Sequence, residues 1–354
     1  METKTTTAQL ELYAGIDVHK NQWTVTILSK HVSHATFSQS PFPSVLKTYV
    51  DKHFPNSVVH CAYEAGKFGY WIQRELSSYR YDCMVINPAD IPTTSQEKQN
   101  KTDPIDSRKI ANSLRAGLLK GIYVPTIEQE GDRQLFRYRK KVWGDLCRVK
   151  NRIKDKVLFA GISIPTQFDN ATWSHGFISW LEQVKFKSPS ARLTLDLLLE
   201  QYIQLKKHFQ KVSNQVRALQ RKSSYKENAK LLRGIPGIGP LTTVELLTEI
   251  GDVNRFSDFK HFNSFIGFKP STHSSGMHDW KGHLTHRHHN GLRSSLVECA
   301  WTARKRDPVL LMCYEKLMER TTGKRAIVII ARKLLSRIYH VLKYKDSYEL
   351  SMVR

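Results

Sequence analysis

Four carboxylates in the first third of the chain are spaced in a way that suits metal-assisted phosphate chemistry. Asp17 lies inside an apolar run, Glu64 ends a later apolar run, and Asp103 and Asp106 are three residues apart. A carboxylate buried in an apolar strand needs a partner or a metal ion, because an isolated buried charge is costly. Carboxylate oxygens are the ligands that Mg²⁺ takes, together with water and phosphate oxygens. The four residues are therefore a candidate Mg²⁺ site.

Each of these carboxylates also has an ordinary explanation when it is taken alone. Asp17 precedes the polar stretch 19–21, and Asp is common beside turns. Asp103 and Asp106 suit the first turn of a helix, where acidic residues cap amides and favour the helix dipole. Only the joint arrangement of the four residues favours a metal site over these separate roles.

Alternating strand and helix patterns predict an α/β domain over residues 1–125 that would position the carboxylates. The predicted strands are 14–18, 23–28, 32–37, 57–63 and 83–86, and the predicted helices are 43–51, 69–78 and one that starts at Pro104 with Asp103 as its N-cap. In such a sheet Asp17 and Glu64 can lie side by side. A helix that crosses the sheet can bring Asp103 and Asp106 against them.

The charge of the chain points to a polyanionic partner. The chain has 354 residues, with 55 Lys and Arg against 32 Asp and Glu, which gives a formal charge of +23. Such a field attracts nucleic acids, although an anionic membrane surface or solubility alone are alternatives. No apolar run approaches the roughly 18–20 residues that span a bilayer. The five cysteines form no CxxC pair, and the N-terminus has no apolar signal core, so we expect a reduced cytoplasmic protein.

Residues 126–228 are predicted to form a basic helical arm. The segment 133–156 is rich in Lys and Arg and has helical spacing. A later segment carries apolar residues alternately three and four apart, at Leu198, Tyr202, Leu205, Phe209, Val212, Val216 and Leu219. This heptad spacing favours a coiled coil, as a helical hairpin or as an arm that pairs with another subunit. An ordinary amphipathic helix is the alternative.

Residues 229–354 are predicted to form a mainly helical domain with a helix-hairpin-helix unit. Gly234, Gly237 and Gly239 join two apolar helices, and glycine amides can approach a phosphate closely. A tight turn between packed helices is the alternative.

A polar loop is expected at 267–276. A cluster of histidine and basic residues follows it, at Lys281, His283, His286, Arg287, His288, His289 and Arg293. No cysteine or carboxylate shares the spacing of a zinc site, so phosphate contacts by Lys281, Arg287 and Arg293 are favoured.

The order of the acids along the chain resembles the RNase H-like fold and, within it, the RuvC-type resolvases. The resemblance then narrows to the DEDD-type transposases of the insertion-sequence one-ten family, which includes the Piv invertases. The motifs that carry it are Tyr13-Ala-Gly-Ile-Asp-Val-His-Lys, Tyr63-Glu-Ala-Gly, Asn87-Pro-Ala-Asp, Lys101-Thr-Asp-Pro-Ile-Asp-Ser-Arg-Lys, Leu232-Arg-Gly-Ile-Pro-Gly-Ile-Gly, Phe265-Ile-Gly-Phe-Lys-Pro, Ser274-Ser-Gly and Leu292-Arg. Together they cover nearly the whole chain.

The resemblance implies a RuvC-like metal site for Mg²⁺ at Asp17, Glu64, Asp103 and Asp106. It also implies a nucleophilic serine that directly precedes a glycine, which maps onto Ser275 with Ser274 as the rival. A serine hydroxyl needs activation by a base or a metal to attack a phosphate. The implied reaction is DNA recombination through a covalent phosphoserine, which conserves the energy of the broken bond.

The resemblance further implies a structured non-coding guide RNA that pairs with donor and target DNA. It implies a coiled-coil linker and a homo-oligomer, a dimer or a tetramer built as a dimer of dimers. It places the protein in the bacterial cytoplasm, associated with the nucleoid. Base pairing would then read the DNA sequence while the protein holds the backbones.

One departure and two rival functions remain. The family commonly has Lys-Arg-Gly after the serine segment, whereas this chain has His286-Arg287-His288, which puts the local DNA contacts in doubt. The first rival is a Mg²⁺-dependent structure-specific nuclease, similar to a Holliday-junction resolvase, in which water attacks. The second rival is a non-catalytic nucleic-acid-binding protein.

Overall fold

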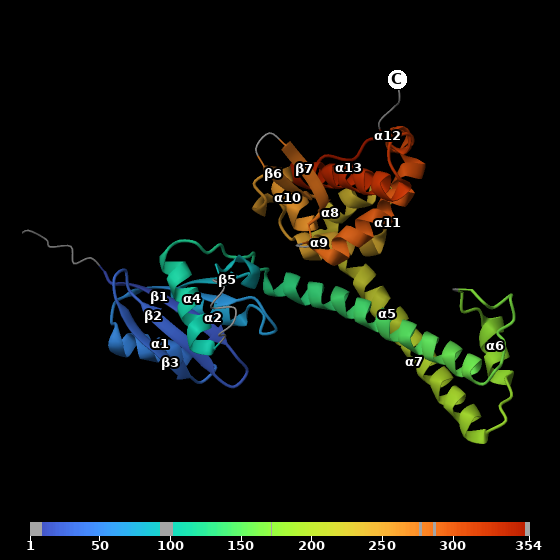
Figure 1. The fold of residues 1–354 in the computed structure, drawn as a ribbon, viewed down its shortest axis with the longest axis horizontal. Coiled ribbons are helices and arrows are strands. Elements are labelled where there is room, and N and C mark those ends of the chain that lie inside the picture. Colours follow the sequence, from blue (N-terminus) through green and yellow to red (C-terminus); the bar gives the residue numbers. More distant parts are fainter. Residues whose placement is uncertain (1–8, 93–101, 171, 276–277, 286–287, 351–354) are drawn as a thin grey trace, which may run out of the picture. The chain divides into compact units, whose positions relative to one another are not determined.

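The computed structural model describes residues 9–92, 102–170, 172–275, 278–285 and 288–350. The chain divides into two compact units, residues 1–124 and residues 125–354 (Figure 1).

The first unit is built on a mixed sheet of five strands in the order β3-β2-β1-β4-β5. Its elements are β1 (Glu11–Val18), β2 (Trp23–Leu28), β3 (Ser33–Gln39), α1 (Pro43–His53), β4 (Val58–Glu64), α2 (Trp71–Ser78), β5 (Asp82–Ile86), the 3-10 turn η1 (Pro88–Asp90) and α4 (Asp103–Arg115). β2 is antiparallel to both of its neighbours, β1 and β3, whereas β1, β4 and β5 run parallel to one another. The α/β prediction for this part of the chain is confirmed.

The two faces of the sheet are covered by different helices, because side chains alternate across each strand. Leu12 and Ile16 of β1 are buried on one face in a core that includes residues of α1 and α2. On the other face, Ile110 and Leu114 of α4 pack against Ala62 of β4. The odd-numbered residues of β1 therefore face α4.

Gly15 allows the backbone of α4 to lie directly on β1. A Cβ atom at Gly15 would lie 2.1 Å from the carbonyl oxygen of Ser107 and 2.4 Å from the amide nitrogen of Ala111. The Ser107 hydroxyl also shares a buried hydrogen bond of 2.9 Å with the hydroxyl of Thr26 on β2. These small residues fix α4 against the sheet at the level of its first turns.

Two long helices begin the second unit and run antiparallel to each other. They are α5 (Ile127–Phe159) and α7 (Pro189–Leu219), with α6 (His175–Gln183) between them in the chain (Figure 1). Asp132 near the start of α5 pairs with Lys222 just after α7, while the rings of Trp143 and Phe209 lie 5.2 Å apart. We call α5, α6 and α7 the arm.

The predicted heptad residues lie on the side of α7 that packs on α5. Tyr202, Val212, Val216 and Leu219 are buried, and the other three members are partly buried. Residues of α5 share both apolar clusters with them. The burial of this face gives the arm its stability, since most helical stability in proteins comes from packing of an apolar face.

The rest of the second unit is mainly helical, as predicted. Its elements are α8 (Ser223–Arg233), α9 (Pro240–Ile250), η2 (Val253–Arg255), α10 (Phe259–Ile266), β6 (Pro270–Ser275), β7 (His278–Leu284), α11 (Asn290–Arg306), α12 (Pro308–Met318) and α13 (Gly323–Tyr344). One apolar core joins α8 to α13. The expectation of a polar loop at 267–276 is wrong for residues 270–275, because they form β6, which pairs antiparallel with β7. Backbone groups form this ladder, so polar side chains do not prevent it.

Candidate functional site

Asp17 lies near the end of β1, on the face that α4 covers. Its side chain is 20% exposed. α4 begins at Asp103, with Thr102 as its N-cap, so the prediction of Asp103 as N-cap was off by one residue. Burial raises the pKa of Asp17, His19 opposes that shift, and the charges of Asp103 and Asp106 raise it further. The structure therefore brings these three acids close enough to interact.

Glu64 lies on the neighbouring strand, at the same end of the sheet. β1 and β4 are parallel, and Ile16 pairs with Tyr63 in their register. The next residues along the two strands are Asp17 and Glu64. Because side chains alternate, both point to the face that α4 covers. All four predicted acids thus lie at the same end of the sheet, on β1, β4 and the start of α4.

His19, which the sequence reasoning missed, forms a compact group with two of these acids, Asp17 and Asp103. Its Nε2 atom lies 3.2 Å from Asp17 Oδ2 and 3.6 Å from Asp103 Oδ1. One ligand atom from each of the three residues lies within 4.8 Å of the others. The spacing Asp17-Val-His19 was the available signal, since residues two apart in an extended segment share a face.

Lys109 is a second residue that the sequence reasoning missed. Its Nζ atom lies 3.5 Å from Asp106 Oδ1, and both side chains are only 13% exposed. The ammonium group balances part of the negative charge in the first turns of α4. Residues three apart on a helix are neighbours, so this contact was readable from the sequence.

The donor set suits a divalent cation. Carboxylates of Asp17 and Asp103 lie close together at the half-exposed end of the central strand β1, and their mutual repulsion is one cause of the raised pKa of Asp17. A bound cation relieves such repulsion, and oxygen ligands with open positions are typical of Mg²⁺ and similar ions. The four acids Asp17, Glu64, Asp103 and Asp106, which we call the acid cluster, are therefore a candidate divalent-metal site.

The predicted nucleophile lies on a strand of the second unit. Ser275 is the last residue of β6 and pairs with His278, while Ser274 pairs with Asp279. The described part of the chain includes the backbone of these residues and of Lys281 on β7, but not their side chains. His286 and Arg287 lie outside the described residues.

The predicted glycine hairpin joins α8 to α9, and one of its glycines has a packing role. Gly237 has φ of 86°, and a Cβ atom there would lie 2.4 Å from the carbonyl oxygen of Cys299 on α11. Gly234 caps the end of α8 and Gly239 is the N-cap of α9. Gly237 is thus required by the approach of α11, while phosphate contacts by the three glycines stay a prediction.

Arg293 and the described histidines are engaged within the protein. The Nη1 atom of Arg293 donates to the carbonyl oxygens of Gly267, at 3.4 Å, and Thr285, at 3.5 Å. His288 Nδ1 lies 3.1 Å from the oxygen of Thr285. His289 pairs with a carboxylate of α9. These contacts hold the end of the β6–β7 pair where β6 begins and β7 ends, which we call its base. No shared metal site forms among the histidines that the structure describes.

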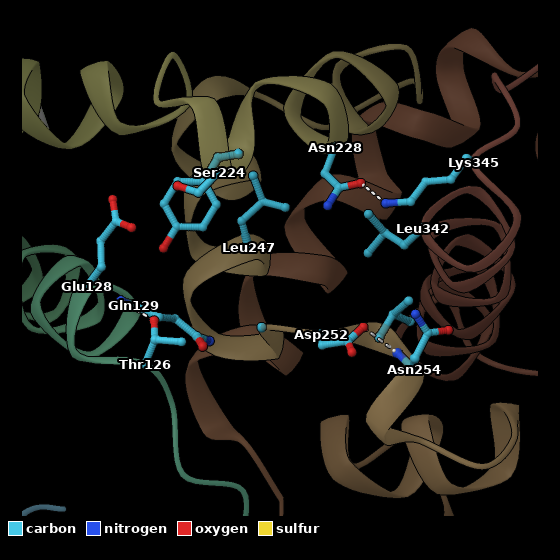
Figure 2. Close-up of a pocket in the computed structure, with 13 residues that line it drawn as sticks. Thr126, Glu128, Gln129, Ser224, Asn228, Leu247, Asp252, Asn254, Leu342 and Lys345 are labelled. Atoms are coloured by element: carbon cyan, nitrogen blue, oxygen red, sulfur yellow. Dashed lines mark hydrogen bonds between the residues drawn. The ribbon is translucent and has the colours of Figure 1, made fainter.

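A pocket of about 280 Å³ lies elsewhere in the second unit. Figure 2 shows Glu128 and Gln129 of α5 on one side of it and Asn228 of α8 with Lys345 on the other. Its lining includes the carboxylates of Glu128 and Asp252, which do not favour a phosphate. None of the predicted site residues lines it, so it does not belong to the candidate site.

In the part of the chain that the structure describes, no helix combines the length and the apolarity needed to cross a bilayer.

Two family models match the chain. An IS110-type DEDD model, described as a transposase, matches residues 14–160. A second model, described as the transposase IS116/IS110/IS902 family, matches residues 229–315. The acid cluster lies within the first match, and the β6–β7 pair lies within the second. These matches place the chain in the class of DNA-acting transposases, and the DEDD type agrees with a divalent-metal site at the acid cluster.

Curated relatives agree with these matches. The transposase for insertion sequence element IS1533 of Leptospira borgpetersenii is 25% identical over 72% of this chain and 74% of its own length. The transposase for insertion sequence element IS1328 of Yersinia enterocolitica is 24% identical over 81% and 82%. The pilin gene-inverting protein of Moraxella lacunata is 24% identical over 95% and 97%. This chain belongs to the IS110 family of transposases.

Proposed function

We propose that this chain is an insertion-sequence transposase that cuts and rejoins DNA through a covalent phosphoserine, with Mg²⁺ at the acid cluster and a structured RNA as guide. One observation carries the proposal. The acidic first turn of α4 is packed onto the end of β1 beside Asp17, because Gly15 leaves room for the helix backbone. This arrangement gathers like charges, and a cation-binding role accounts for them jointly.

The topology of the first unit supports an RNase H-like, RuvC-like fold. Its strand order is β3-β2-β1-β4-β5, with β1 to β3 antiparallel and β4 and β5 parallel to β1. Acids stand on the first strand, on the fourth strand and on a late helix, which is the order that the resemblance implies. Asp17, Glu64, Asp103 and Asp106 are the proposed ligands of this fold.

The proposed chemistry is a phosphoryl transfer to serine. The Ser275 oxygen forms a bond to the scissile phosphorus, and the bond from that phosphorus to the leaving deoxyribose oxygen breaks. The serine proton is lost to a base, and the leaving oxygen gains a proton. Bound Mg²⁺ would stabilise the negative charge that develops on the phosphate oxygens. Rejoining reverses these steps with a new deoxyribose hydroxyl.

The second unit is proposed to hold the nucleic acids. We expect the arm at 126–228 to act as a coiled-coil linker and the part at 229–354 as a domain with a helix-hairpin-helix unit. Amides of Gly234, Gly237 and Gly239, together with Lys281, Arg287 and Arg293, are the proposed phosphate contacts. The charge of +23 supports binding of DNA and RNA backbones.

The guide RNA and the oligomer rest on the resemblance to the family. We propose that a homo-oligomer, a dimer or a tetramer, joins donor and target DNA in the bacterial cytoplasm, close to the nucleoid. The names of the relatives, transposases of insertion elements and a protein that inverts a pilin gene, support a DNA rearrangement as the outcome.

A covalent adduct tests the serine directly. The full-length protein is incubated with its element-end DNA and Mg²⁺, then denatured and resolved for protein–DNA adducts. We expect an adduct that is lost in Ser275→Ala and kept in Ser274→Ala. Cleavage without any adduct would favour the nuclease in which water attacks. Binding without cleavage, unchanged by Asp17→Ala, would favour a non-catalytic binder.

The guide RNA has its own test. Protein purified from its native locus is expected to carry one defined RNA species, and recombination should stop after RNase treatment. Recovery of bulk cellular RNA, together with full recombination after RNase treatment, would refute the guide while leaving the serine chemistry in place.

A further inference from the structure

A buried carboxylate of α9 connects the arm to the base of the β6–β7 pair. Glu249 has a side chain that is only 4% exposed. Arg137 of α5 donates to it twice, from Nε at 2.8 Å and from Nη2 at 2.7 Å. Arg133 Nε lies 3.5 Å from the same carboxylate and donates to the backbone oxygen of Thr248 at 3.0 Å. Two arginines of the arm thus converge on one acid.

His289 reaches Glu249 from the opposite side. Its Nε2 atom lies 3.1 Å from Glu249 Oε2. Its Nδ1 atom accepts the backbone N–H of Leu292, at 3.1 Å, and caps α11. Because Nδ1 is an acceptor, the geometry assigns the ring proton to Nε2, which donates to Glu249. The contact therefore has a defined direction and is a charge-assisted hydrogen bond.

The backbone of His289 closes the segment that carries the serines. Its N–H donates to the carbonyl oxygen of Phe265 at 3.2 Å. A second hydrogen bond lies nearer to the strands, where the N–H of Thr285 donates to the carbonyl oxygen of Lys269, also at 3.2 Å. Gly267 has φ of 95°, and a Cβ atom there would lie 2.1 Å from His288 Cβ. The two ends of the β6–β7 segment are thus held tightly together, with His289 at one of them.

We propose that Glu249 is a positioning residue, which ties the base of the serine-bearing β6–β7 pair to the arm through His289 on one side and Arg137 on the other. The role of the serine rests on the proposed function above. The mechanical link itself rests on the contacts of Glu249 alone. A shift of the arm is then transmitted to the strand that ends in Ser275.

A neighbouring ion pair supplies a matched control. Glu245, one turn before Glu249, also has a 4% exposed side chain and pairs with Lys140 of α5. Its second oxygen accepts the hydroxyl of Ser295, inside α11, at 2.6 Å. This pair joins the arm to α11 without touching the base of the β6–β7 pair. Lys140→Gln therefore removes an arm contact of similar burial but leaves the proposed link.

The experiment compares Glu249→Gln, His289→Asn and Lys140→Gln in the full-length protein. Asn is a strong N-cap, so His289→Asn keeps the cap of α11. The Asn side chain is too short to reach Glu249, so the substitution removes that contact. Two measurements are made, namely hydrogen exchange at the amides of 271–275 and 278–284, and the rate of covalent adduct formation with DNA. DNA affinity is measured as a third quantity, because the loss of a positioning residue should leave it unchanged.

For Glu249→Gln and His289→Asn we expect about tenfold faster exchange in β6 and β7. The adduct should form roughly tenfold or more slowly, since small misplacements of a nucleophile are costly. DNA affinity should stay within about twofold of wild type, and Lys140→Gln should behave as wild type in all three measurements. Unchanged exchange in His289→Asn, or an equal rise in Lys140→Gln, overturns the link. Faster exchange without any adduct in wild type supports the link and counts against the serine chemistry.

Discussion

Acidic residues of the two units lie in opposite electrostatic surroundings. In the first unit, burial raises the pKa of Asp17, and the charges of Asp103 and Asp106 raise it further against the opposing effect of His19. In the second unit, burial also favours a raised pKa of Glu249. There, however, hydrogen bonds from His289 and Arg137, together with the charge of Arg137, outweigh burial and lower the pKa to about 2.

The difference separates a binding site from a structural contact. Glu249 is matched by donors of the protein, and it joins α9 to α5 and to the start of α11. The acid cluster gathers like charges at the half-exposed end of β1, which costs stability unless a cation is bound. Perturbed carboxylates of this second kind are typical of functional sites.

The largest effect is expected from Asp17→Asn. The substitution removes a ligand, so DNA cleavage should fall on the order of 10²–10³-fold, which is typical for the loss of one electrostatic group at a reacting phosphate. The unfolding temperature should stay level or rise, because repulsion with Asp103 and Asp106 is relieved. Cleavage rates and thermal unfolding check both parts. Asp51→Asn on the exposed end of α1 is the control, and equal losses in the two variants would contradict the site.

Glu249→Gln should lower the stability of the folded protein, in contrast to Asp17→Asn. The folded pKa of about 2 lies below the ordinary value of 4.5, so the charge contributes stability above about pH 4.5 that is lost as pH falls toward 2. The difference corresponds to about 3 kcal/mol. Denaturant unfolding at pH 7 should show this loss in Glu249→Gln, and the two proteins should converge near pH 2. A pH-independent difference would contradict the assignment.

Gly15→Ala should damage the first unit through sterics. The new Cβ would meet the backbone of α4 at 2.1 Å, which is an overpacking change that costs about 1–3 kcal/mol. DNA cleavage should fall with it, because the acidic turn of α4 moves away from β1. Gly131→Ala in α5 is the control, since nothing lies within 4 Å of its added Cβ. That control should gain about 0.5–1 kcal/mol.

The smallest effect is expected at the exposed pair of Lys47 and Asp51 on α1. Their side chains are 41% and 57% exposed, and they stand four residues apart. Lys47→Met should change the free energy of unfolding by no more than about 0.5 kcal/mol. A loss as large as that of Glu249→Gln would mean that burial does not set the difference between the two kinds of ion pair.

Much of the first unit could be predicted from the sequence. Period-two patterns gave the strands, and β2 has the predicted bounds, Trp23–Leu28. The four acids could be singled out as candidates because each lies at or near the end or the start of a predicted element. The role of Gly15 could not be predicted, since it depends on which helix crosses β1. His19 was missed because a polar residue after a strand is usually part of a turn.

Less of the second unit could be predicted. The helices of the arm follow from apolar spacing, but the burial of Glu245 and Glu249 does not, because their partners lie more than 100 positions away on α5. β6 was taken for a loop because its side chains are polar. Strand pairing there uses the backbone, which residue types reveal only weakly.

The role of the acid cluster is tested most directly by asking whether it binds a divalent ion. Thermal unfolding of the full-length protein is measured with and without saturating MgCl₂, for wild type and for Asp17→Asn. An ion at about 100 times its dissociation constant stabilises the folded state by about 2.7 kcal/mol. We predict a higher unfolding temperature with Mg²⁺ in wild type and no change in Asp17→Asn. An equal shift in both proteins, or none in wild type, would contradict the proposal that Asp17 and its neighbours form a metal site.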